Sequence, residues 1–149
     1  MKNNRIVRVS AKSLIPFILM FGLYVQFHGD YGPGGGFQAG VIFAAGAVLF
    51  TLVFGLRRAR LAFRPRVLEA ALAGGVLLYI SVGIASMLRG GAFLDYGVLA
   101  HDPVHGQHLG ILLVELGVGI TVAAVTITLF FLFAGRGIRG PCLEKGERR

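Results

Sequence analysis

Apolar residues gather in four long stretches that occupy most of the chain, and polar residues are concentrated in the connections between them. A helix that crosses a bilayer needs about 20 consecutive apolar residues. The pattern therefore predicts an all-α integral membrane protein. Its single transmembrane domain covers 1–149, with four transmembrane helices at about 11–28, 37–56, 67–88 and 108–134.

The basic residues are concentrated in the segments that the pattern places on one side of the membrane. Fourteen of the 15 Lys and Arg residues lie in the N-terminal segment, the connection 57–66 and the C-terminal segment. The other two connections hold only Arg89. Because Lys and Arg are enriched in the cytoplasmic loops of membrane proteins, this distribution predicts an N-in/C-in topology.

Composition and charge narrow the classes of function. The chain is 55% hydrophobic and carries a formal net charge of +8 at pH 7. Each basic cluster borders an apolar stretch, where it meets the anionic headgroups of membrane lipid. No soluble face remains for nucleic acid, so nucleic-acid binding is excluded. The single cysteine, Cys142, lies in the predicted cytoplasmic tail and gives no disulfide framework.

The connection between the first two predicted helices is rich in proline and glycine. Its sequence is DYGPGGG, with Pro33 followed by Gly34, Gly35 and Gly36. Proline has no N–H and glycine has large backbone freedom, so this loop cannot be regular helix. Non-helical backbone at membrane depth is tolerated only against protein or water, which predicts a tight re-entry at a packed interface. A phosphate-binding loop is excluded because no Lys-Ser or Lys-Thr pair follows the glycines.

Small residues continue into the second predicted helix. Gly36, Gly40 and Ala44 recur at four-residue spacing and therefore share one face. Such a face allows another helix to approach closely in a membrane.

Glu115 is the one carboxylate well inside a predicted span. It lies seven residues after His108, which is about 10 Å along a helix. A carboxylate exposed to lipid at that depth would cost about 2.5–3.5 kcal/mol, so Glu115 is expected to face protein or water. Two interpretations stay open: a proton or cation relay, or a buried acid that is hydrogen-bonded to a neighbouring subunit for packing.

Polar residues also mark the predicted outer side. Three histidines and an acid within one short segment could suggest zinc. We expect Pro103 and Gly106 to break any helix that would align the imidazoles, and no cysteine is near, so no metal site is predicted. The segment is expected to be a polar outer loop, or a proton-collecting surface because histidine titrates near neutral pH. The outer polar candidates are His28, Asp30, Asp95, His101, Asp102, His105 and His108.

The residues show no catalytic constellation and no cofactor site. The predicted helices contain no haem-ligating histidine pair, and the chain lacks the cysteines of an iron–sulfur cluster. An enzyme is therefore not expected.

Two motifs together resemble one protein family. The first is His28-Gly29-x3-Pro33-Gly34-Gly35-Gly36-Phe37-Gln38-x-Gly40, and the second is Glu115-Leu116-Gly117-Val118-Gly119-Ile120-Thr121-Val122. The basic connection after the second helix and Phe93-Leu94 after the third also fit. The chain resembles the MnhB-domain family, the MnhB subunits of the multisubunit Mrp (Mnh)-type sodium/proton antiporters.

The resemblance implies a small subunit of the bacterial cell (inner) membrane that takes part in sodium/proton antiport. Expected partners are two large complex I-like antiporter subunits and several small membrane subunits. Glu115 stands where the family more often has Asp, and the histidine-rich stretch is unusual. Two alternatives remain: an MnhB-like membrane subunit of a complex I-related redox complex such as a membrane-bound hydrogenase, and a purely structural scaffold subunit.

Overall fold

The computed structural model describes residues 5–29 and 32–136. All the regular elements in that part of the chain are helical. In chain order they are α1 (Arg5–His28), α2 (Gly36–Phe54), α3 (Leu56–Ala62), α4 (Pro65–Leu88), the 3-10 helix η1 (Tyr96–Leu99) and α5 (Pro103–Arg136). Four of these helices, α1, α2, α4 and α5, are long and apolar enough to cross a membrane. The predicted all-α fold with four transmembrane helices is confirmed.

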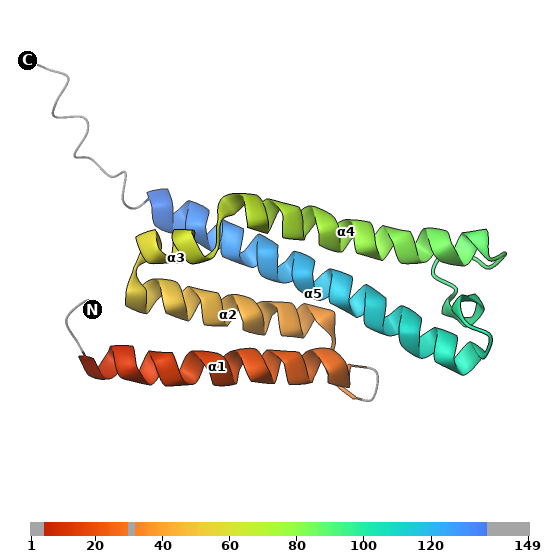
Figure 1. The fold of residues 1–149 in the computed structure, drawn as a ribbon, viewed down its shortest axis with the longest axis horizontal. Coiled ribbons are helices and arrows are strands. Elements are labelled where there is room, and N and C mark those ends of the chain that lie inside the picture. The colour runs from red at the N-terminus through yellow and green to blue at the C-terminus, as the bar shows by residue number, and fades with distance from the viewer. Residues whose placement is uncertain (1–4, 30–31, 137–149) are drawn as a thin grey trace, which may run out of the picture.

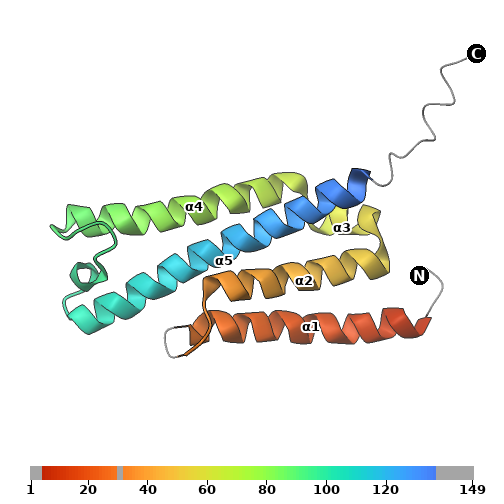
Figure 2. The same ribbon diagram turned by 180° about the vertical axis from the view of Figure 1, so that it is seen from behind.

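The four long helices lie side by side in one layer (Figures 1 and 2). Their order across the layer is α1, α2, α5, α4, because α2 packs against both α1 and α5, and α4 packs against α5. The last helix of the chain therefore lies between two earlier ones. Many large apolar side chains of these helices are exposed, as expected where lipid or partner subunits cover them.

Three helices differ slightly from the predicted bounds. α1 begins at Arg5 rather than near residue 11, because its basic first turns continue the same helix. α2 begins at Gly36, and α4 begins at Pro65, whose missing N–H suits the first turn. The basic connection contains the additional short helix α3, and its Ala59 belongs to the same buried apolar cluster as Leu68 of α4.

The start of α5 corrects the sequence-based expectation. Pro103 and Gly106 do not break the helix, which begins at Pro103 rather than near residue 108. The Asp102 carboxylate caps it by accepting a hydrogen bond from the Val104 N–H at 3.1 Å. Proline is well tolerated at the first helical position, where its missing N–H would have no intrahelical partner. The connection between α4 and α5, named the outer connection for its predicted side, therefore covers 89–102 and is shorter than the predicted 90–107.

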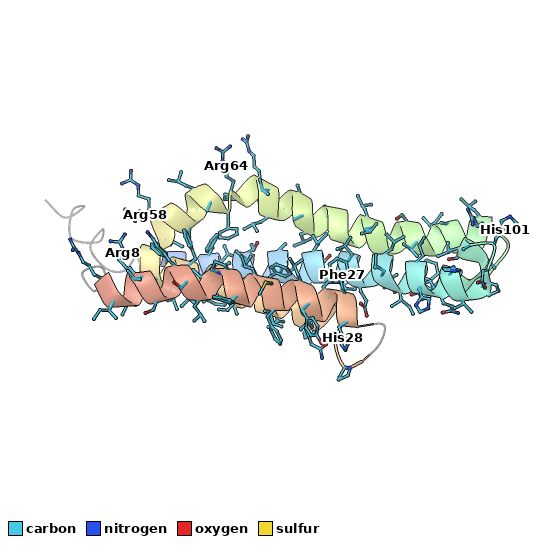
Figure 3. All side chains as sticks on the ribbon, turned by 60° about the horizontal axis from the view of Figure 1, so that its bottom comes forward. Arg8, Phe27, His28, Arg58, Arg64 and His101 are labelled. Carbon is cyan, nitrogen blue, oxygen red and sulfur yellow. The ribbon has the colours of Figure 1, made fainter. Side chains whose placement is uncertain are left out.

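Charged residues mark the two ends of the layer. Arg8, Arg58 and Arg64 lie at the end where α1 begins, whereas His101 lies at the opposite end (Figure 3). The Arg8 guanidinium lies 5.7 Å from the centre of the Phe54 ring, so a cation–π contact joins α1 to the end of α2. These positions follow the charge pattern of the sequence, and the N-in/C-in orientation stays a prediction.

Candidate polar site around Glu115

The Glu115 carboxylate lies beneath the glycine-rich turn that joins α1 to α2. A Cβ atom placed on Gly29 would lie 2.5 Å from either carboxylate oxygen. A Cβ atom placed on Gly35 would lie 3.0 Å from Oε1. Neither position has room for a side chain, so the carboxylate is covered directly by the backbone of the turn.

The turn folds back along the end of α1. The Gly35 N–H donates to the Val25 carbonyl at 3.4 Å, and the Gly32 N–H donates to the His28 carbonyl at 3.1 Å. Gly35 has a φ of 122°, which glycine adopts readily and other residues rarely do. The glycines of this segment therefore let the chain double back and approach Glu115 closely.

α2 begins at the depth of Glu115. A Cβ atom on Gly36 would overlap the Glu115 backbone carbonyl, and one on Gly40 would lie 2.6 Å from the Gly119 carbonyl oxygen. The small face predicted for this helix therefore packs against α5. Glu115 is twelve residues after Pro103, or about 18 Å along α5. The α1–α2 turn thus lies well short of the outer ends of α4 and α5 (Figure 1).

Gln26 continues the polar site one helical turn further inward. This α1 side chain is buried, and its Oε1 lies 2.6 Å from the position of a Cβ atom on Gly119. Gly119 follows Glu115 by one turn of α5, and Gln26 precedes Gly29 by one turn of α1. Glu115 and Gln26 therefore occupy successive levels of the same α1–α5 contact. Gln26 was not among the predicted site residues, although a glutamine within an otherwise apolar stretch was a signal that could have found it.

The acidic residues of the outer connection are used in local structure. The Asp95 carboxylate accepts a hydrogen bond from the Gly97 N–H at 3.3 Å and so caps η1. The Asp102 carboxylate caps α5, and His105 Nε2 lies 3.9 Å from Asp102 Oδ2 at the exposed outer end. Over the described ranges 5–29 and 32–136, no three His, Cys, Asp or Glu residues form a group that could hold a metal ion.

The remaining outer candidates are dispersed. His28 stacks on Tyr24 with ring centres 5.1 Å apart, at the end of α1. His101 lies at the far tip of the molecule (Figure 3), and His108 is exposed on α5. Asp30 lies outside the described residues. The structure therefore brings Glu115 together with the turn, and the described histidines form no group of three with one another or with acidic residues.

The outer connection folds down onto α4 and α5. The Arg89 guanidinium donates to the Val98 carbonyl at 3.4 Å and also to the Leu99 carbonyl. The Tyr96 ring packs against Gly110. Burial, and then the neighbouring Tyr79, raise the pKa of the Tyr96 hydroxyl above its usual range, so the hydroxyl stays protonated at neutral pH.

Comparison with known proteins identifies the family. A family model described as "Domain related to MnhB subunit of Na+/H+ antiporter" matches residues 6–128. This chain belongs to the MnhB family. The resemblance inferred from the two motifs is thereby confirmed, and the matched region contains both the glycine-rich turn and Glu115.

Relatives of this MnhB-family chain match it along nearly their whole length. A Staphylococcus haemolyticus (strain JCSC1435) protein with the name antiporter subunit mnhB2 is 32% identical over 139 residues, which cover 91% of this chain and 98% of that protein. A Staphylococcus aureus (strain Newman) protein of the same name is 34% identical over 139 residues, with the same coverage. The family and the four apolar helices show a multi-pass protein of the bacterial cell membrane.

Proposed function

We propose that this chain is an integral membrane subunit of a multisubunit sodium/proton antiporter. We also propose that Glu115 is a relay residue in the outer part of its proton or cation route. Membership of the MnhB family and the antiporter names of its relatives support the first part. The proposed role of Glu115 rests on one observation. Its carboxylate lies inside a transmembrane helix, directly beneath the glycine-rich turn that joins α1 to α2.

The surroundings of Glu115 suit a group that exchanges a proton or a cation. The glycine backbone at Gly29 and Gly35 lies directly over the carboxylate. The first turn of α2 begins beside it at Gly36, and the positive end of a helix dipole favours an acidic group. Non-helical backbone at this depth is stable only beside protein or water, so the turn over Glu115 has to be shielded from lipid.

The chain supplies part of a route rather than a whole one. Inward of Gln26, the described residues that follow between α1 and α5 are apolar. The hydroxyls of Thr51, Thr121 and Thr128 all donate to carbonyls in their own helices, at 2.7–2.8 Å. Exchange across the whole membrane therefore requires groups from partner subunits, as expected for one subunit of an assembly.

Transport in inverted membrane vesicles tests the role of Glu115. The whole gene cluster is expressed in a host that lacks its own sodium/proton antiporters, and sodium-dependent collapse of the pH gradient is measured. Glu115→Gln should lower exchange by about tenfold or more, because positioned proton-transfer groups contribute ~10²–10⁴-fold to rates. Glu115→Asp should keep a substantial part, since it keeps the carboxylate. Glu69→Gln, which changes an exposed carboxylate on α4, should leave exchange unchanged.

A native gel of the same membranes separates loss of exchange from loss of assembly. Full exchange by an assembled Glu115→Gln complex would contradict the relay and favour the scaffold subunit. The single layer of helices is the observation that favours this second candidate, because its many exposed apolar side chains need cover.

A further inference from the structure

The contact between α1 and α5 opens into a groove on its inner side. The two helices meet near Gln26 and Gly29 and then diverge, with α2 between them (Figure 1). The groove has a volume of about 600 Å³ and is bounded by α1, α2, α5 and the start of α4. Its lining is apolar apart from Gln26, which lies where α1 and α5 converge.

Small residues line much of the groove. They come from two adjacent helices and include Gly46 and Ala47 of α2, and Gly119, Ala123 and Ala124 of α5. Larger side chains such as Leu23 of α1 and Phe63 of the α3–α4 connection stand at its sides. A surface of small residues lets the backbone of another helix approach closely inside a membrane.

Because of Gln26, whatever occupies the groove has to supply a hydrogen-bond partner. The side chain is 8% exposed and lines the groove. Within the described part of the chain, no residue forms a hydrogen bond with the Gln26 amide. The same residues include no completely buried side-chain nitrogen or oxygen without a partner. The amide is therefore accessible, and it opens into the groove that Gln26 lines. A buried amide that finds no hydrogen-bond partner is destabilising, and the partner has to come from whatever fills the groove.

We propose that the groove docks a transmembrane helix of a partner subunit, and that this helix presents one hydrogen-bonding side chain to Gln26. The inference rests on the proposed function, because it requires a multisubunit complex. A lipid acyl chain would fill the apolar part but has no group that can pair with the amide. The partner side chain is a hydroxyl, an amide or a carboxyl, and it lies next to Gln26 on the inward side of Glu115.

Photo-crosslinking in the whole complex identifies the occupant. Benzoylphenylalanine replaces Leu23, which lines the groove, and in a matched control it replaces Tyr24, the next residue on α1, which is exposed and does not line the groove. The Leu23 position should form an adduct with a transmembrane segment of another subunit, found by mass spectrometry of the crosslinked peptide. The Tyr24 position should not give that adduct. Adducts of the Leu23 position with phospholipid alone, or with a second copy of this chain, would overturn the proposal.

Substitution of Gln26 tests the hydrogen bond. Gln26→Leu should reduce the fraction of the chain that co-purifies with the crosslinked subunit by roughly three- to tenfold, the range expected for one interhelical hydrogen bond in a membrane. Gln38→Leu, at an exposed glutamine of α2 outside the groove, should leave that fraction unchanged. Equal or tighter association of Gln26→Leu overturns the pairing.

These measurements are independent of transport. A crosslink at Leu23 and weaker association of Gln26→Leu support the docking helix even where Glu115→Gln exchanges normally. Loss of exchange in Glu115→Gln with only lipid adducts at Leu23 would keep the proposed function and remove the docking helix.

Discussion

At the scale of single residues, the glycines of this chain divide into two kinds. Gly36 has no space for a Cβ atom, because such an atom would overlap the backbone carbonyl of Glu115. Gly74, in the interior of α4, has nothing within 4 Å of the same position. The first kind is required for the contact between α2 and α5, and the second is not required by packing.

This difference predicts opposite effects of the same substitution. Gly36→Ala should destabilise the protein by about 1–3 kcal/mol, because the extra methyl group forces α2 away from α5. Gly74→Ala should be neutral or should stabilise it by up to about 1 kcal/mol, the difference in helix propensity. The temperature at which the assembled complex disappears from a native gel measures both. A Gly36→Ala complex as stable as Gly74→Ala would show that the helices can separate at no cost.

The position of Glu115 beside the turn also shows what the sequence could predict. Each feature was visible alone, since a carboxylate in an apolar stretch and a PGGG segment are local patterns. Their association joins the first and last transmembrane helices, and no local pattern states which helices are neighbours. Gln26 was also visible alone as a glutamine in an apolar stretch, but its position beside Gly119 of α5 was not.

At the scale of elements, α5 is the most informative helix. Its 34 residues give a length of about 51 Å, well beyond the ~30 Å of a hydrocarbon core. The apolar stretch 108–134 predicted most of α5 correctly. The first turn, from Pro103, was missed because Pro103 was expected to break the helix. The pair Asp102-Pro103 is in fact a typical helix start, with a capping carboxylate before a first-turn proline.

The cap predicts local stability at the outer end of α5. Asp102→Ala removes the acceptor of the Val104 N–H and should cost about 0.5–2 kcal/mol at this helix end. Amide hydrogen exchange of residues 104–107 in the purified complex should therefore become faster. Asp102→Asn keeps a capping oxygen and serves as the control. Identical exchange in the Ala and Asn variants would mean that the outer connection, rather than the cap, holds this turn.

At the scale of the whole molecule, the protein is a layer with unlike ends. The basic end holds Arg8, Arg58 and Arg64, and the opposite end holds His101 and the folded outer connection (Figure 3). The four spans were predictable because hydrophobic length is read directly from the sequence. Their single-layer order was not, because small and apolar residues occur on every helix.

Labelling of single cysteines tests the predicted orientation. In a Cys142→Ser background, a membrane-impermeant maleimide added to intact cells or spheroplasts should label His101→Cys and should not label Arg58→Cys. In inverted vesicles the pattern should reverse. The physical reason is the retention of Lys and Arg clusters on the cytoplasmic side. Labelling of Arg58→Cys from outside would reverse the assigned topology.

The order of helices in the layer constrains how this protein matures. α4 is synthesised before α5, yet α5 is the transmembrane helix that α4 packs against, and α5 also separates α4 from α2. When α4 leaves the insertion machinery, the transmembrane helix that it packs against is not yet made. α4 must be held by lipid or by an insertion factor until the last helix arrives. Joined by the folded outer connection, α4 and α5 then pair as a hairpin, and α5 brings that hairpin to α2. Among the described helices, α5 is thus the one that joins α4 to α2, and a chain truncated before α5 would leave α4 without its transmembrane partner.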